Sequence, residues 1–211
     1  MSISFEISKD PVLLERYYNI REECFRRELG VRSFDGGEDV FDLTGKILIV
    51  KDGELCIGGA RLSSSTSTNP GLLPMEKNGF LILREFPEIA HSNKGYCQWT
   101  RLALLPEYRT TTMLRMMTQV MINEVINQGY SYSFGISGLN RSRLYRRLHQ
   151  AAGYNYEIRR DVKIQEEGAF AGLEHLLSIG YLENTADPLV ARSSSHRESL
   201  TSRPVQLRIV A

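Results

Sequence analysis

The sequence predicts an α/β (α+β) protein with a mixed, mostly antiparallel central sheet and helices on both faces of that sheet. Two observations favour this class. Two strands joined by a tight turn come early, at 46–50 and 54–62, and a strand–helix–strand unit follows between residues 97 and 136. Hairpin strands pair antiparallel, whereas a helical crossover places two strands in parallel. We therefore expect one parallel pair within an otherwise antiparallel sheet.

The chain opens with a strand and a long helix. Residues 2–8 alternate between polar and apolar side chains, which is typical of a half-buried strand. Asp10 and Pro11 are suited to begin a helix, because an aspartate accepts hydrogen bonds from free N–H groups and proline fits the first turn. Gly30 ends this helix after about Leu29.

An acidic loop and the hairpin come next. Residues 31–43 show no hydrophobic period and are predicted as the loop. The hairpin turns at 51–53, where an Asp-Gly pair favours a tight turn. Gly58 and Gly59, inside its second strand, indicate a bulge or a close backbone approach. Residues 63–79 are rich in Ser, Thr, Asn, Pro and Gly, which predicts another loop.

Strands and helices alternate through the rest of the chain. Residues 80–90 predict a short helix or a turn around Pro87. The further expected elements are, in order, a strand at 97–105, a helix at 110–128, a strand at 130–136, a helix at 140–152, one or two strands in 154–165 and a short helix at 172–179. We expect a single domain over 1–183, then a polar C-terminal segment, 184–211, with an exposed loop at 184–204 and a final strand or frayed end at 205–210.

Composition and charge exclude several classes of protein. Apolar residues make up 42% and charged residues 24%, as in ordinary globular proteins. The 26 basic and 25 acidic residues leave a net charge of +1, which predicts no nucleic-acid or membrane partner. No apolar run reaches the roughly 18 residues of a membrane span, and no secretory signal is seen. Three scattered cysteines and four separated histidines indicate a reduced, cytoplasmic protein without a metal site.

The turn before the helix at 110–128 is a candidate anion site. Arg109 is followed there by Thr110, Thr111 and Thr112. Free N–H groups and the helix dipole attract anions at the start of a helix. These residues either hold a phosphate or form an ordinary threonine cap beside a solvated arginine.

Four short motifs occur in order along about residues 15–155. They are Arg21-x-x-x-Phe25 followed by Leu29-Gly30, Asp39-Val40-Phe41-Asp42, Gly58-Gly59-Ala60-Arg61-Leu62 and Gln98-Trp99-Thr100-Arg101-Leu102. The ordered set resembles the LuxI-type acyl-homoserine lactone (autoinducer) synthases and the related N-acyl amino acid synthases. These form a branch of the GNAT acyltransferase superfamily, and the LuxI-type enzymes lack the glycine-rich pyrophosphate loop.

The resemblance implies a GNAT-like fold and a quorum-sensing type of N-acyltransferase. Such an enzyme transfers a fatty acyl group from acyl carrier protein or coenzyme A to the amine of a small amino-acid-type acceptor, and it binds no cofactor permanently. It implies catalytic roles for Arg21, Asp39, Asp42, Arg61, Gln98 and Arg101. It assigns donor binding to Leu102, Leu104, Arg109, Thr110, Thr111 and Thr112, and a substrate tunnel to Phe25, Trp99, Met113 and Met117.

The charged residues of these motifs allow two interpretations. A guanidinium binds a carboxylate with two parallel hydrogen bonds, so Arg21, Arg61 and Arg101 are candidates for the acceptor's carboxylate. Asp39 and Asp42 would then pair with its ammonium group. The alternative is an internal salt-bridge network that fixes the acidic loop, since buried charges must be paired.

The chain departs from the family at two positions. Val31 and Arg32 stand where the family has a tryptophan, and Gln98 stands where it has a glutamate proposed as the base. A neutral amide accepts no proton from an amine, so this task falls to a water relay or to an acidic-loop carboxylate. Tyr145 and His149 are candidates to protonate the leaving thiolate. An acetyltransferase that uses acetyl-CoA and a non-catalytic GNAT-like binding protein are the alternative functions.

The predicted helix at 140–152 is strongly basic. Its arginines are Arg141, Arg143, Arg146 and Arg147. They either dock an acidic acyl carrier protein by charge attraction or form a solvated face. The sequence leaves the acyl length, the acceptor and the oligomeric state open.

Overall fold

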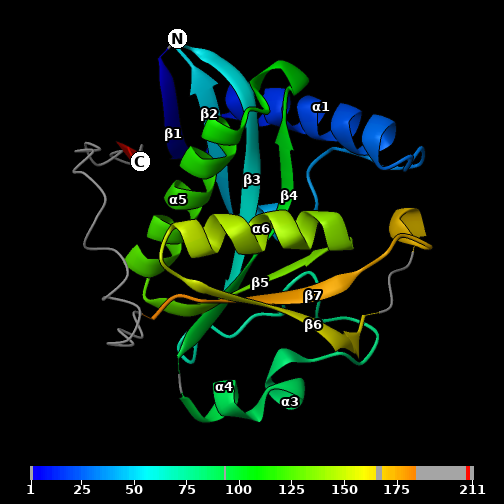
Figure 1. The fold of residues 1–211 in the computed structure, drawn as a ribbon. Helices are drawn as coiled ribbons and strands as arrows, with labels where there is room; N and C mark the ends of the chain where they lie inside the picture. Colours follow the sequence, from blue (N-terminus) through cyan, green and yellow to red (C-terminus); the bar gives the residue numbers. More distant parts are fainter. Residues whose placement is uncertain (1, 93, 165–167, 184–207, 210–211) are drawn as a thin grey trace.

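One eight-stranded sheet organises the protein, and its strand order is β6-β7-β5-β4-β3-β2-β1-β8 (Figure 1). The computed structural model describes residues 2–92, 94–164, 168–183 and 208–209. The strands are β1 (Ile3–Ser8), β2 (Lys46–Asp52), β3 (Leu55–Ser65), β4 (Gly95–Leu104), β5 (Tyr130–Ser137), β6 (Asn155–Lys163), β7 (Leu176–Tyr181) and β8 (Arg208–Ile209). The helices are α1 (Pro11–Glu28), α2 (Val40–Thr44), α3 (Ile82–Glu85), α4 (Pro87–Ser92), α5 (Thr111–Asn127) and α6 (Leu139–Ala151), with short 3-10 turns η1 (Pro106–Tyr108) and η2 (Gly168–Phe170).

The expected mixed sheet is confirmed. The pairs β1–β2, β2–β3, β3–β4, β5–β7 and β6–β7 are antiparallel. β4 and β5 are parallel and are joined through α5, as the late crossover predicts. β8 adds a short second parallel pair on β1. The pairing of β4 with β5 ends at Gln98 and Phe134, although both strands continue, so the sheet opens beyond this point.

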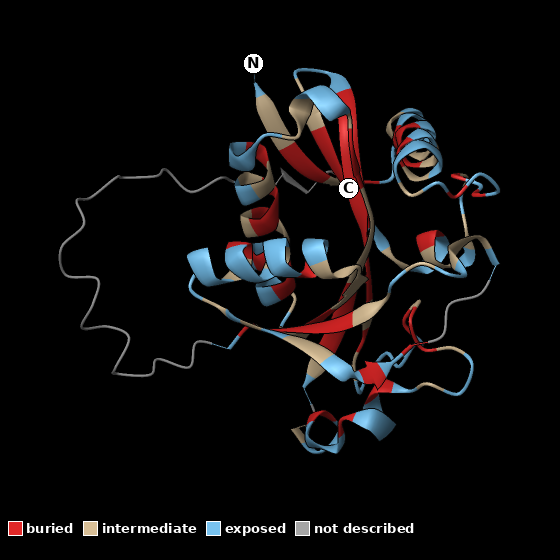
Figure 2. Ribbon diagram, turned by 45° about the vertical axis from the view of Figure 1, so that its right-hand side comes forward, coloured by how far each residue is buried: buried red, intermediate tan, exposed pale blue. Residues whose placement is uncertain are grey.

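Helices cover both faces of the sheet, also as expected. Side chains alternate across β2, so Ile47 and Ile49 pack under α1 while Leu48 and Val50 pack under α5. α6 lies on the α5 side and contacts β5, β6 and β7. Figure 2 shows the buried strands between α1 and the α5–α6 layer. A short helix or turn was expected within 80–90, and residues 82–85 and 87–92 form α3 and α4 below the sheet.

The local signals at the helix starts are confirmed. The Asp10 side chain accepts a 2.8 Å hydrogen bond from the Val12 N–H, and Pro11 is the first residue of α1. The Thr110 side chain accepts a 3.1 Å hydrogen bond from the Met113 N–H at the start of α5. These side chains satisfy N–H groups that have no partner within the helix.

Three elements differ from the prediction. α2 lies inside the predicted loop 31–43, and β3 continues to Ser65, into the predicted loop 63–79. The short helix expected at 172–179 is wrong, because Leu176–Tyr181 form strand β7. β7 is paired on both sides and its central residues are buried, so its sequence lacks the alternation that marks a half-exposed strand. The loop expected at 184–204 lies outside the described residues.

Within the part of the chain that the structure describes, no helix is both long and apolar enough to cross a membrane.

Candidate active site

A cavity of about 470 Å³ lies where β4 and β5 part. Trp99–Leu102 line it from β4 and Ser133–Ser137 from β5. Its wall draws on both faces of the sheet, with Phe25, Leu29 and Phe170 on the α1 side and Met121, Ile122 and Val125 of α5 on the other. The opening between the two strands therefore joins two chemically different halves.

Arg21 and Asp42 form a buried pair beside this cavity rather than in its wall. Both terminal nitrogens of Arg21 lie 3.0 Å from Asp42, each from a different carboxylate oxygen. Arg21 Nε donates to the Gly36 carbonyl at 2.8 Å, and Nη2 donates to the Gly37 carbonyl. The Arg21 side chain is 1% exposed and that of Asp42 is fully buried. This pair fastens the segment between α1 and α2.

Arg61 extends the network to the cavity wall. Its Nη1 contacts Asp39 and lies 3.1 Å from Asp42, and its Nε donates to Thr100 at 3.0 Å. Asp39 and Asp42 also cap α2 reciprocally, which explains a helix that lacks an apolar period. Burial raises the pKa of the Asp39 carboxyl, but the hydrogen bond and charge of Arg61 outweigh it and hold that pKa below its usual range.

Arg101 lies among aromatic rings in the cavity wall. Its guanidinium lies 4.8 Å from the ring of Phe34, 4.9 Å from Phe170 and 5.8 Å from Phe25. Asp39 is 3.6 Å from its Nη2. The buried Nε has no hydrogen-bond partner within the described residues. Burial, with Arg61 nearby, lowers the pKa of this guanidinium. Because Arg101 lines the cavity and its side chain is 22% exposed, an anion there would meet its positive charge.

Gln98 lies in the wall and supports a loop. Its Oε1 accepts a 3.0 Å hydrogen bond from the Met75 N–H, and its side chain is buried. The buried carboxylate of Glu76 accepts 2.9 Å hydrogen bonds from the N–H groups of Leu73 and Ile82. These contacts fold residues 73–82 against the cavity. Glu76 could not be predicted from the sequence, because it is isolated in an irregular segment.

The predicted donor-binding residues are dispersed. Leu102 lines the cavity, whereas Leu104 is in the core under α5. Arg109 turns toward α1, where it donates to the Leu104 carbonyl at 2.8 Å and pairs with Glu28. The three threonines at the start of α5 are exposed and lie outside the cavity wall; they are Thr110, Thr111 and Thr112.

The apolar half of the cavity lies between β4 and the α5–α6 layer. Trp99 lines this half, whereas Phe25 lines the cavity on the α1 side, beside Arg101. Met113 and Met117 instead pack in the core with β2 and β3, and Met121, one turn further along α5, reaches the cavity. The α5 period alone could not distinguish core from tunnel, because all three methionines share one helix face.

Three polar rings lie at the α6 end of the cavity, namely Tyr145, His149 and Tyr156. His149 Nδ1 is 2.8 Å from the Tyr145 carbonyl oxygen, so Nδ1 carries the proton and Nε2 is an acceptor. Burial lowers the pKa of His149 and raises the pKa of Tyr145. The pair therefore supplies a neutral imidazole and a protonated phenol. Tyr156, 4.4 Å from the His149 ring, was not predicted.

Among the described residues, no three histidine, cysteine, aspartate or glutamate side chains are grouped to hold a metal ion.

Comparisons with known proteins identify the fold. No model of a known protein family matches the sequence, and no curated protein sequence matches it. Among solved structures, FeeM, an N-acyl amino acid synthase from uncultured soil microbes, aligns with a TM-score of 0.59 at 10% identity, over 86% of this chain and 91% of FeeM. The structure of the coenzyme A-dependent acyl-homoserine lactone synthase BjaI, with S-adenosylmethionine and isopentyl-CoA, aligns with a TM-score of 0.58 at 16% identity. The alignment covers 90% of this chain and 89% of BjaI.

An acetyltransferase aligns as well. The N-acetyltransferase from Staphylococcus aureus Mu50 has a TM-score of 0.55 at 12% identity, over 87% of this chain and all of that one. At these identities the likeness concerns the fold alone. The chain has the GNAT-like fold that its motifs predict.

Proposed function

We propose that this chain is an N-acyltransferase that moves a fatty acyl group from an acyl thioester to the amine of an amino-acid-type acceptor. The observation that carries the proposal is the cavity between β4 and β5, which is apolar toward α5 and cationic toward α1. This asymmetry fits a reaction that joins an acyl chain to a small anionic amine. Solved structures with this fold include an N-acyl amino acid synthase and acyl-homoserine lactone synthases.

The acyl donor fits the apolar half. Trp99, Met121, Ile122 and Val125 offer a surface that would bury a fatty chain. Beyond Gln98, the edge of β4 that faces β5 has no strand partner in the described chain. Its free backbone groups are suited to pair with the amides of a pantetheine arm, as an edge strand pairs with an extended peptide.

The acceptor fits the cationic half. The Arg101 guanidinium lines this half, and Arg61 adds positive charge to the same wall. A carboxylate held here would leave the amine of the same molecule close to the opening between the strands. The engagement of Asp42 by two arginines favours a structural role for this carboxylate.

The chemistry then needs one proton acceptor and one proton donor. The amine attacks the thioester carbonyl, forming the C–N bond and breaking the C–S bond. Water in the cavity takes the proton from the amine, because Gln98 is neutral. Tyr145, protonated at neutral pH, gives its proton to the departing thiolate and regains one from solvent. Positioning supplies much of the rate, since a thioester is already reactive.

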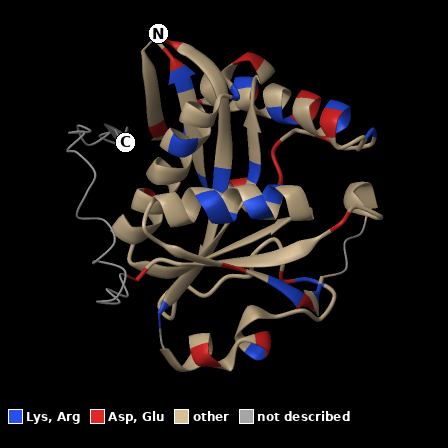
Figure 3. Cartoon of the chain, viewed as in Figure 1, with Lys and Arg blue, Asp and Glu red and all other residues tan. Residues whose placement is uncertain are grey.

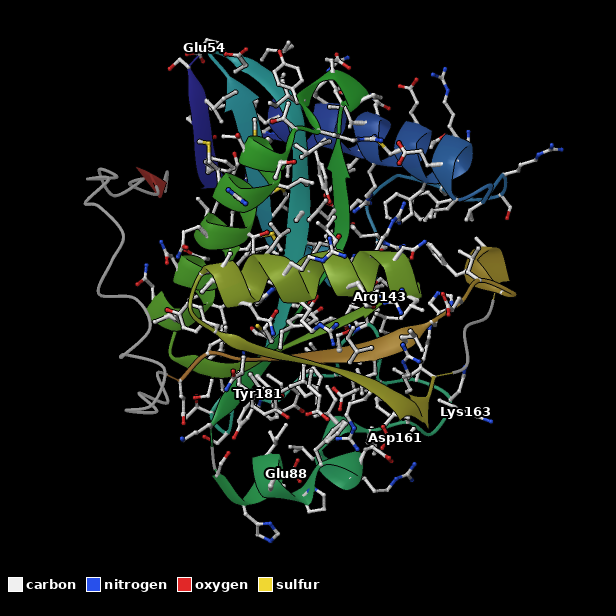
Figure 4. The ribbon with its side chains drawn as sticks, viewed as in Figure 1. Glu54, Glu88, Arg143, Asp161, Lys163 and Tyr181 are labelled. Atoms are coloured by element: carbon white, nitrogen blue, oxygen red, sulfur yellow. The ribbon has the colours of Figure 1, made fainter. Side chains whose placement is uncertain are left out.

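An acyl carrier protein fits the surface of α6. Basic residues gather on this helix (Figure 3), and Arg143 lies on its exposed side (Figure 4). Arg146 and Arg147 are exposed beside it. Such a patch would attract an acidic carrier protein and orient its prosthetic arm. Coenzyme A is the alternative donor.

Purified protein tests this function. It is mixed with octanoyl thioesters of acyl carrier protein and of coenzyme A, with each amino acid in turn, and free thiol release is followed. We expect thiol release that depends on both donor and amino acid, with octanoyl amide as the product. Turnover of acetyl-CoA alone would favour an ordinary acetyltransferase, and no turnover by the folded protein would favour a binding protein.

A further inference from the structure

The backbone at Arg101 is unusual and is held by one buried hydroxyl. Arg101 has a φ of 57°, a left-handed conformation that side chains with a Cβ rarely adopt. The pairing of β3 with β4 shifts between Gly59 and Arg61, so that two residues of β4, Arg101 and Leu102, stand opposite Ala60. This is a bulge, and bulges re-aim side chains beside functional sites.

Tyr17 of α1 reaches this bulge from the other layer. Its hydroxyl donates a 2.6 Å hydrogen bond to the Arg101 carbonyl oxygen. The Tyr17 side chain is completely buried, and burial raises its pKa, so the hydroxyl stays protonated and remains a donor. No other side-chain hydrogen bond to this carbonyl is found among the described residues.

The glycine pair on β3 makes room for this contact. A Cβ on Gly59 would lie 2.9 Å from the Tyr17 ring and 2.4 Å from the Leu48 carbonyl oxygen, which no ordinary contact allows. Any larger residue at Gly59 would push Tyr17 off the sheet. The close approach indicated by Gly58-Gly59 therefore serves the position of Tyr17.

We infer that Tyr17 is a positioning residue of the acceptor subsite, which holds the Arg101 bulge so that the Arg101 guanidinium in the cavity wall faces the acceptor's carboxylate. The inference rests on the proposed function for the identity of the ligand. Three aromatic rings restrain the Arg101 guanidinium, and Tyr17 restrains the backbone that carries it. A side chain fixed at both ends binds an anion with little further loss of freedom.

The adjacent tyrosine supplies a matched control. Tyr18 lies on the same helix, and both rings contact the Arg21 guanidinium. The guanidinium carbon is 4.5 Å from the ring centroid of Tyr18 and 5.4 Å from that of Tyr17. Tyr17→Phe removes the hydroxyl that holds the bulge. Tyr18→Phe removes a hydroxyl of the same helix that makes no hydrogen bond to Arg101 among the described residues. A general effect of losing a tyrosine hydroxyl from α1 would appear in both variants.

Ligand binding tests the inference without requiring turnover. Trp99 is the single tryptophan and lines the cavity, so its fluorescence reports occupancy. The probes are N-octanoyl-L-leucine and N-(3-methylbutyl)octanamide, the same molecule without the carboxylate. We expect wild type and Tyr18→Phe to prefer the carboxylate probe. Tyr17→Phe should weaken the binding of the carboxylate probe about three- to tenfold and leave the affinity for the amide probe unchanged.

The other outcomes overturn the inference. Equal affinity of the wild type for both probes would show that the cavity has no subsite for a carboxylate. An unchanged preference in Tyr17→Phe, or equal weakening of both probes, would make the hydroxyl merely structural. Arg101→Lys keeps the charge but loses the planar guanidinium that binds a carboxylate with two hydrogen bonds, so it should reproduce the selective loss. In turnover, Tyr17→Phe should raise the acceptor KM and leave kcat and the donor KM unchanged.

The proposed function can fail separately. A selective carboxylate effect in binding, with no amino-acid-dependent thiol release by wild type, would support the subsite and contradict the acyltransferase. Turnover of amines and amino acids alike, with unchanged probe binding in Tyr17→Phe, would support the acyltransferase and contradict the inference.

Discussion

Arg21 donates hydrogen bonds to Asp42 from both terminal nitrogens, and the two side chains are almost completely buried. Two of the sequence motifs contain these residues, which form a clamp beside the cavity. The clamp matters for the site because Asp42 also contacts Arg61, which lines the cavity.

Breaking the clamp should destabilise the protein strongly. Arg21→Ala removes one of the two arginines that pair with the buried Asp42 carboxylate. Loss of a partner from a buried ion pair lowers the free energy of unfolding by about 3–5 kcal/mol. Arg27→Ala, which removes an exposed ion pair with Glu23 on the same helix, should cost at most about 0.5 kcal/mol. Urea unfolding of both variants measures the difference. Equal, small losses would show that the clamp is not structural.

Gln98 should tolerate glutamate but not leucine. A carboxylate at this position can still accept the Met75 N–H, whereas Gln98→Leu leaves that buried donor unpaired, at a cost of about 1–3 kcal/mol. Thermal unfolding compares the two variants. Gln98→Glu also adds a base to the cavity wall, so its acyl transfer should be at least as fast as that of wild type. A severe loss of turnover in a stable Gln98→Glu protein would contradict the positioning role of this amide.

The stability of the protein should depend on pH through His149. Burial lowers the pKa of His149 in the folded state below its value of about 6.5 in the unfolded chain. The unfolded state therefore binds a proton first, so this contribution to stability is complete above about pH 6.5 and declines as the pH falls toward the folded pKa.

The variant His149→Asn isolates this contribution. Its amide can still donate to the Tyr145 carbonyl but does not titrate. We expect the melting temperature of wild type to fall more steeply than that of the variant between pH 7 and pH 5. Parallel curves would show that His149 is not buried as a neutral ring.

The basic face of α6 should matter for a carrier protein and not for coenzyme A. Replacing Arg143, Arg146 and Arg147 by serine should raise the KM for octanoyl acyl carrier protein about tenfold at low salt, because charge attraction steers the encounter. The KM for octanoyl-CoA should stay the same. Arg115→Ser, an exposed arginine on α5, is the control. Equal changes with both donors would argue against a docking face.

Met121 should set the space for the acyl chain. Met121→Trp fills the apolar half of the cavity, so the variant should favour acyl donors shorter by about two to four carbons. Each methylene that is no longer buried weakens the binding of the longer donor by about 0.8 kcal/mol. Met117→Leu, a conservative change in the neighbouring core, should not alter the preference. Competition among acyl-CoA chain lengths measures the change. An unaltered profile in Met121→Trp would place the chain elsewhere.

Much of the fold could be predicted because its signals are local. Asp10 and Pro11 mark the start of α1, and the hairpin turn marks β2 and β3. α2 was missed because reciprocal capping by Asp39 and Asp42, not an apolar period, holds it. β7 was mistaken for a helix because pairing on both sides buries it and removes its alternation.

The site could be predicted only in part, because it depends on distant segments. The motifs gave Arg61, Gln98 and Arg101, which line the cavity. They could not reveal Tyr17, which is 84 residues from Arg101 in sequence. From the α1 pattern alone Tyr17 is an ordinary core tyrosine, and only the structure shows its hydroxyl on the bulge. Nor could the α5 period show that Met121, and not Met117, reaches the opening between β4 and β5.

Mass spectrometry of lipid extracts from bacteria that express the chain tests acyl transfer most directly, with Arg101→Ala as the matched control. We expect a new N-acyl compound that the control lacks or makes in far smaller amount, with fragments that give the chain length and a head group bearing a carboxylate. A lactone head group would identify an autoinducer synthase. The absence of any new acylated amine, with the protein folded and abundant, would contradict acyl transfer by this chain.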